Sequence, residues 1–199
     1  MYDKRTLINL ALAWLGQEGV SALDLVADTP SPKVEKALNF YGPAALAAQA
    51  SAPWLCCLTW VELSPAVGLP GEPDMVSAYT LPDEALRVWS VDLPPEVRWR
   101  EAVAVLPEQV TRKVLRTAST GGVTVAYCRA IPESGWDPML ADAFALELAA
   151  RLAGPINADG GLAQQLRNRS REAYQVARAA QAGRANLHDL YGPGPMTAA

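Results

Sequence analysis

Glu133 and Asp137 are two residues of this sequence whose type and spacing could do chemistry. They lie four residues apart, just before a predicted helix, and two carboxyl groups on either side of a glycosidic bond can hydrolyse it. Asp137 is followed by Pro138, however, which is typical of a helix N-cap and would give this carboxylate a structural role. Glu133 falls in a predicted turn. A structural pair and a small glycan (cell-wall) hydrolase therefore both stay open.

Other catalytic and metal-binding arrangements lack the residues that they need. The chain of 199 residues has one histidine, His188, and three cysteines, too few for a multi-histidine site, a four-cysteine zinc site or a disulfide framework. His188 lies in a tail rich in glycine and proline, which offers a catalytic base no rigid support. Cys56 and Cys57 are expected to be small core residues. We expect no catalytic residue, no cofactor and no metal.

Nucleotide-binding and membrane-spanning segments are not expected either. Neither G-x-G-x-x-G nor G-x-x-x-x-G-K-S/T occurs, and Gly160-Gly161 are expected to form a plain loop rather than an anion site. The longest apolar run, residues 53–61, is far shorter than the roughly 20 residues that cross a bilayer. These features predict a soluble protein made in the cytoplasm, without a signal peptide.

Charge is distributed unevenly along a chain whose net charge is -4. Residues 62–108 hold nine acids and three arginines, whereas residues 167–184 hold five arginines and one acid. These arginines cover an outward arc of the last predicted helix: Arg167, Arg169, Arg171, Arg178 and Arg184. A solvated face and an interface with an acidic partner, such as the acidic segment of a neighbouring copy, both explain this arc.

Apolar spacing predicts the helices that position these residues. Apolar residues recur at intervals of three or four residues, in segments that are bounded by capping residues, prolines and glycines. The predicted helices cover residues 3–15, a segment that starts at Ser31-Pro32, and residues 54–63, 138–154 and 160–182. The pair Gly42-Pro43 should break or kink the second of them. In the last, Leu166, Ala173, Val176, Ala177 and Ala180 should face inward.

Between residues 79 and 131, apolar residues alternate with a period of two instead of the helical period. This alternation predicts a block of about four strands. They are expected over residues 86–93, 97–105, 110–118 and 123–131. Ser119–Gly122 is predicted to be a hairpin turn between the last two strands. Trp14, Trp54 and Trp136 should be core residues of the helices.

The order of elements predicts an α+β fold. A helical bundle domain would be built from residues 1–64 and 136–185, with an inserted antiparallel β domain over residues 74–133. The tail, residues 186–199, should be flexible in the free subunit. Its apolar residues Leu187, Leu190 and Tyr191 are further candidate interface residues, which could become ordered against a partner, while an inert end is the alternative.

Several segments together resemble one protein family. Tyr79–Val88, with the sequence YTLPDEALRV, is similar to the Y-x-L-P-x-D-x-L-R-V segment of the tail tubular protein A family, the head-to-tail adaptors of short-tailed bacteriophages. Tyr41-Gly42-Pro43, followed ten residues later by Pro53-Trp54, resembles the pattern near the front of these proteins. Val125-Ala126-Tyr127 and then Trp136-Asp137-Pro138 look like the family's strand and returning helix.

The resemblance implies a structural virion protein rather than an enzyme. Members of this family form a homo-oligomeric ring, expected to be a dodecamer, between the portal protein and the tail nozzle or a downstream tail protein. Genomic DNA would pass through the ring without sequence-specific binding, which suits a mildly acidic chain that cannot hold phosphates tightly. The expected location is the neck or tail of the virion, after assembly in the host cytoplasm. A neck or head-completion protein of a long-tailed phage would also fit.

Overall fold

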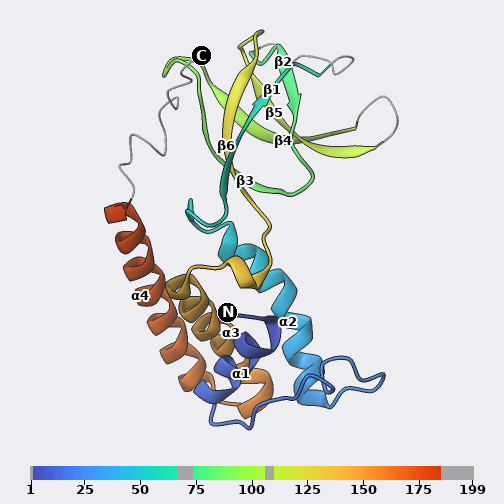
Figure 1. Ribbon diagram of the computed structural model, residues 1–199, viewed down its shortest axis with the longest axis vertical. Helices are drawn as coiled ribbons and strands as arrows, with labels where there is room; N and C mark the ends of the chain where they lie inside the picture. The colour runs from blue at the N-terminus through green and yellow to red at the C-terminus, as the bar shows by residue number, and fades with distance from the viewer. Residues whose placement is uncertain (1, 67–73, 106–109, 185–199) are drawn as a thin grey trace. The chain divides into compact units, whose positions relative to one another are not determined.

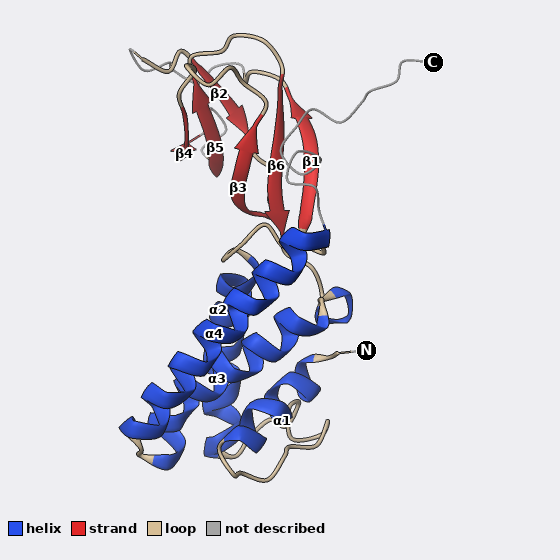
Figure 2. Cartoon of the chain, turned by 90° about the vertical axis from the view of Figure 1, so that its left-hand side faces the viewer, coloured by secondary structure: helices blue, strands red, loops and turns tan. Residues whose placement is uncertain are grey.

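The computed structural model describes residues 2–66, 74–105 and 110–184, except for the side chain of Arg184. The fold is α+β, as predicted. The chain divides into two compact units (Figures 1 and 2), one made of residues 2–56 and 131–184, the other of residues 57–130. The predicted tail, with Leu187, Leu190 and Tyr191, lies outside the described residues.

The helical unit contains four α-helices and one short 3-10 helix. They are α1 (Lys4–Trp14), α2 (Pro32–Gln49), η1 (Glu133–Gly135), α3 (Pro138–Asn157) and α4 (Gly160–Arg184). The strand unit contains β1 (Leu58–Leu63), β2 (Ser77–Thr80), β3 (Ala85–Val91), β4 (Trp99–Val105), β5 (Thr111–Thr117) and β6 (Val123–Arg129).

Three helices begin where their capping residues predict. The side chain of Asp3 accepts a hydrogen bond from the Thr6 backbone N–H at 2.7 Å, and Ser31 and Asp137 cap α2 and α3 in the same way. α2 and α3 each have proline in the first turn, where the missing N–H costs nothing because it would have no partner within the helix. The predicted N-termini are therefore confirmed.

Internal prolines do not end the helices that contain them. α2 continues through Gly42-Pro43, so of the predicted break or kink the break does not occur, and α3 runs through Pro155 to Asn157. A proline removes one hydrogen bond of the helical ladder. The neighbours of Pro43, however, are core residues: Tyr41, Ala44 and Ala45 are buried. This burial keeps α2 continuous.

α3 is the central helix of its unit. It packs against α1, α2 and α4 and buries ten residues, most of them alanine or leucine. Phe144 lies fully buried in this core, where the rings of Tyr41 and Trp136 meet it edge-on with centroids 5.3 and 5.1 Å away. Small side chains let the neighbouring helices come close to α3, and the three aromatic rings pack together in the same core.

Two antiparallel three-stranded sheets form the strand unit, with the orders β1-β6-β3 and β2-β5-β4. Their core is one cluster to which both sheets contribute, and it includes Tyr79, Val88, Leu115 and Val125. β3 has two register irregularities against β6. At one of them the carboxylate of Glu101 in β4 accepts the Val88 backbone N–H at 2.8 Å, a bond that connects the two sheets.

Two predictions about strands are wrong. Residues 58–63 form β1, which pairs with β6, although a helix was expected over residues 54–63. A short apolar run fits either element, and here pairing with β6 decides between them. Ser119–Gly122 is not a hairpin turn between paired strands, because β5 and β6 lie in different sheets. The Tyr79 hydroxyl holds this connection by donating to the carbonyl oxygens of Ser119 and Gly121, at 3.0 and 2.6 Å.

The tryptophans of the helical unit follow the prediction in two cases out of three. Trp54 and Trp136 are buried, whereas Trp14 is 46% exposed. Trp14 lies at the end of α1, where the next residue, Leu15, is buried instead. The indole N–H of Trp54 donates to the Ala48 carbonyl oxygen at 2.8 Å, so its polar atom is satisfied inside the core.

We expect Trp54→Ala to lower the free energy of unfolding by about 3–5 kcal/mol, because it leaves a large cavity and removes the buried hydrogen bond to the Ala48 carbonyl oxygen. Trp14→Ala is the matched control and should cost about 1 kcal/mol or less. Denaturant unfolding followed by far-ultraviolet circular dichroism measures both. Equal losses in the two variants would contradict the assigned burial.

Candidate functional site

The last helix has one face against α3 and one face toward solvent. Its buried residues recur at intervals of three or four: Ala163, Leu166, Ser170, Tyr174, Ala177 and Gln181. The predicted inward residue Val176 is 58% exposed, so that part of the prediction is wrong. Tyr174 takes the buried position instead, and the arginines fall between the buried residues.

Tyr174 is anchored by a polar contact with α3. Its hydroxyl donates to Oε2 of Glu147 at 2.7 Å. The other carboxylate oxygen of Glu147 accepts two hydrogen bonds from Arg151, one turn further along α3, at 2.5 and 3.2 Å. Both oxygens of Glu147 are thus occupied, and Arg151 compensates its charge. This network fixes the surface between α3 and α4.

Around this network lies a pocket of about 500 Å³. Its walls are the network itself, the small residues Ala150 and Ser170, and two arginines of α4, Arg167 and Arg171. The arginines are one helical turn apart, and among the described residues no hydrogen-bond or ion-pair partner contacts either guanidinium group. Three arginines against one glutamate make the pocket cationic. We name this surface the arginine pocket.

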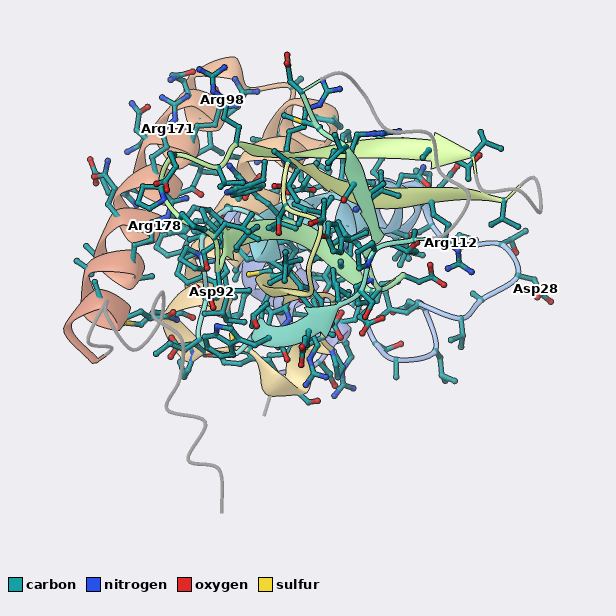
Figure 3. All side chains as sticks on the ribbon, turned by 90° about the horizontal axis from the view of Figure 1, so that it is seen from above. Asp28, Asp92, Arg98, Arg112, Arg171 and Arg178 are labelled. Carbon is teal, nitrogen blue, oxygen red and sulfur yellow. The ribbon has the colours of Figure 1, made fainter. Side chains whose placement is uncertain are left out.

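The predicted arginine arc therefore divides into separate positions. Arg167 and Arg171 come together at the pocket. Arg169 lies over the ring of Trp14, with its guanidinium 5.8 Å from the ring centroid, and Arg178 donates to the Ser51 carbonyl oxygen at 3.0 Å. The side chain of Arg184 is outside the described part of the chain. Arg171 and Arg178 are labelled in Figure 3.

The candidate catalytic carboxylates have structural partners. Glu133 accepts a hydrogen bond from the buried Tyr41 hydroxyl at 2.9 Å. Asp137 caps α3 by accepting the Met139 backbone N–H, also at 2.9 Å. Each carboxylate thus orients a helix or an aromatic ring, which is the structural alternative that the sequence left open.

The other sequence candidates have ordinary positions. Cys57 is buried and Cys56 is partly buried, and neither lies in a helix. Asp159 accepts the Leu162 backbone N–H at 2.9 Å and puts its own carboxylate at the start of α4 beside Gly160-Gly161. This carboxylate already occupies the position that an anion would take at the N-terminus of the helix. His188 lies outside the described residues.

The described residues contain neither a metal-binding cluster nor a helix fit to cross a bilayer. Over residues 2–66, 74–105 and 110–184, no group of three or more histidine, cysteine or acidic side chains is arranged to hold a metal ion. Among the helices of this part of the chain, none combines the length and apolar character that a bilayer crossing requires.

Sequence reasoning missed Glu147, Arg151 and Tyr174 as parts of the site. Glu147 and Arg151 have the four-residue spacing of a helical ion pair, which was a usable signal. Tyr174 falls seven residues before Gln181 and eight after Leu166, on the buried face of α4. The contact between α3 and α4, in contrast, follows from tertiary packing alone.

Comparisons with known proteins add no family assignment. No protein-family model matches the chain, and no curated protein matches it.

Two buried tyrosines make the helical unit sensitive to alkali. Burial raises the pKa of Tyr41 and of Tyr174 far above the ordinary value, and the adjacent Glu133 and Glu147 raise them further. A pKa that is higher in the folded state stabilises the protein fully below pH ~10, the pKa of an unfolded tyrosine. This contribution is lost as the pH rises from there toward the folded pKa.

We expect the free energy of unfolding to fall above pH ~10 by about 1.4 kcal/mol per pH unit for each of these tyrosines. The double variant Tyr41→Phe/Tyr174→Phe should show a flatter decline, whatever its stability at neutral pH. Denaturant unfolding at several alkaline pH values measures the slope. Equal slopes in wild type and double variant would contradict the assignment.

Proposed function

We propose that this protein is a head-to-tail adaptor of a short-tailed bacteriophage, which forms a ring between the portal protein and the tail nozzle. Genomic DNA passes through this ring, and the protein is part of the virion neck or tail. The observation that carries the proposal is the segment Tyr79–Val88, whose sequence resembles the specific segment of the tail tubular protein A family.

The resembling residues of this segment are those on which the strand unit depends. Tyr79, Leu81, Ala85 and Val88 all belong to the buried cluster between the two sheets. The segment contains the end of β2, the turn and the start of β3, and the Tyr79 hydroxyl fixes the distant connection between β5 and β6. Proteins that share a fold tend to share the pattern of residues that forms its core. Its likeness to the adaptor family therefore supports a common architecture.

The resemblance in the helical unit falls on core residues too. Tyr41 and Trp136 both contact Phe144, and Trp54 lies near Tyr174 with ring centroids 6.1 Å apart. All of these rings are buried. The two sets of resembling residues thus lie in both units, which favours likeness over the whole chain rather than in one motif.

The surface chemistry supports an interface more than a reaction. Glu133 and Asp137, the carboxylates that a hydrolase would use, have structural partners. The arginine pocket, in contrast, presents Arg167 and Arg171 without partners in the described chain. A single exposed ion pair contributes only ~0.2–1 kcal/mol. A ring repeats each contact in every subunit, so modest contacts add up.

Electron microscopy of the purified protein mixed with its cognate portal protein tests the proposal. We expect an additional ring on the portal, with the rotational symmetry of a dodecamer, and no such density with the portal alone. The same preparation should not degrade peptidoglycan. Failure to bind the portal, together with peptidoglycan turnover that is lost in Glu133→Gln, would contradict the proposal and favour the hydrolase.

A further inference from the structure

The connection between α1 and α2 is an ordered turn that exposes apolar side chains. The Asn9 side chain holds its start through both the N–H and the carbonyl oxygen of Val20, at 2.7 and 3.1 Å. Ser21 and Asp24 then exchange hydrogen bonds, in which the Asp24 carboxylate accepts the Ser21 N–H at 2.6 Å and the Ser21 hydroxyl accepts the Asp24 N–H at 3.2 Å. These bonds give residues 18–28 a defined shape. We name this segment the acidic loop.

Two aliphatic side chains project from the acidic loop into solvent. Leu23 is 79% exposed and Val26 is 77% exposed. Exposed aliphatic side chains are unremarkable one at a time. These two lie three residues apart on a turn that is itself fixed by hydrogen bonds, and a fixed apolar tip is suited to contact with a partner.

The charge of this loop is opposite to that of the arginine pocket. Glu18, Asp24 and Asp28 are its ionisable residues, all three exposed. Lys33 donates to the backbone carbonyl oxygen of Glu18 at 2.8 Å, which places one positive charge beside the loop without pairing it to a carboxylate. Lys4 and Arg5 lie on the other flank, beside Leu25 and Val26.

The acidic loop and the arginine pocket lie on opposite sides of the helical unit. In Figure 1, α4 is on the left of this unit and the connection between α1 and α2 reaches the lower right. Figure 3, seen from above, places Asp28 on the side opposite Arg171 and Arg178. Two complementary surfaces on opposite sides cannot meet within one chain. They can meet between two copies, and the same contact can then be repeated by a third.

We infer that the acidic loop of one copy docks at the arginine pocket of the next. Asp28 and Glu18 face Arg167 and Arg171, and an aliphatic side chain of the tip enters the pocket beside Ala150 and the Tyr174 ring. This contact is heterologous, since it joins two different surfaces, and heterologous contacts close into rings when their rotation permits. The inference rests on the proposed ring and names the surfaces that hold its subunits together.

Charge reversal on each side separately, followed by mixing, tests this contact with the full-length protein. The pocket variant is Arg167→Glu/Arg171→Glu, and the loop variant is Glu18→Arg/Asp28→Arg. Asp24 is left in place because it holds the turn. The matched control, Arg98→Glu/Arg129→Glu, changes the net charge as much as the pocket variant does, on exposed arginines of the strand unit. Circular dichroism verifies that each variant is folded.

Sedimentation velocity at low ionic strength, over a range of concentrations, is the measurement. Wild type and control should form species larger than a monomer, and these should weaken with added salt. Each reversed variant alone should self-associate at least about tenfold more weakly, since like charges then face each other. An equimolar mixture of the two variants should recover association, because each basic surface again meets an acidic one.

The inference would be overturned by a wild type that stays monomeric at every concentration, by a mixture that associates no better than its components, or by a control that loses as much as the pocket variant. A pocket variant that self-associates normally but no longer binds the portal would also overturn it, and would assign the pocket to the portal. Recovery in the mixture without any portal binding would leave this contact established and contradict the proposed function instead.

Discussion

Burial of α3 on three sides is the constraint on which the helical unit depends. Leu140, Phe144, Leu148 and Leu152 form its central stripe, and alanines fill the positions beside them. A helix covered by three others leaves little room, so larger side chains at the alanine positions would push the helices apart. The same packing determines which residues of α4 face inward. The arginine pocket is therefore a consequence of how α3 is covered.

Two pairs of tyrosine and glutamate bring polar groups into this core. Tyr41 donates to Glu133, and Tyr174 donates to Glu147. Each phenol brings a hydroxyl to the edge of an apolar region, where an unpaired donor would be costly. The glutamates thereby position aromatic rings and, in the case of Glu147, Arg151 as well. Glu133, which is a catalytic candidate in the sequence, helps to hold helices together in this arrangement.

Sequence reasoning was sufficient where structure is local. Asp3, Ser31 and Asp137 cap their helices because a side-chain oxygen accepts a free N–H group of the first turn. An N-cap therefore depends only on a few consecutive residues, which the sequence shows directly. Pairing between distant segments is different. The local pattern of residues 58–63 predicts a helix, because their pairing partner, β6, lies 60 to 70 residues further along the chain. The arginine pocket likewise needs α3 and α4 together, and spacing along one helix cannot supply that.

We propose that this chain acts through one contact that is repeated from copy to copy. Oxidation of the double variant Asp28→Cys/Arg171→Cys tests it most directly, with wild type and the two single variants as controls for the native cysteines. A contact between loop and pocket predicts a ladder of covalent oligomers up to a largest closed species, while each single variant gives at most the dimer. A double variant that stops at a doubly linked dimer, or that stays monomeric, would contradict the account.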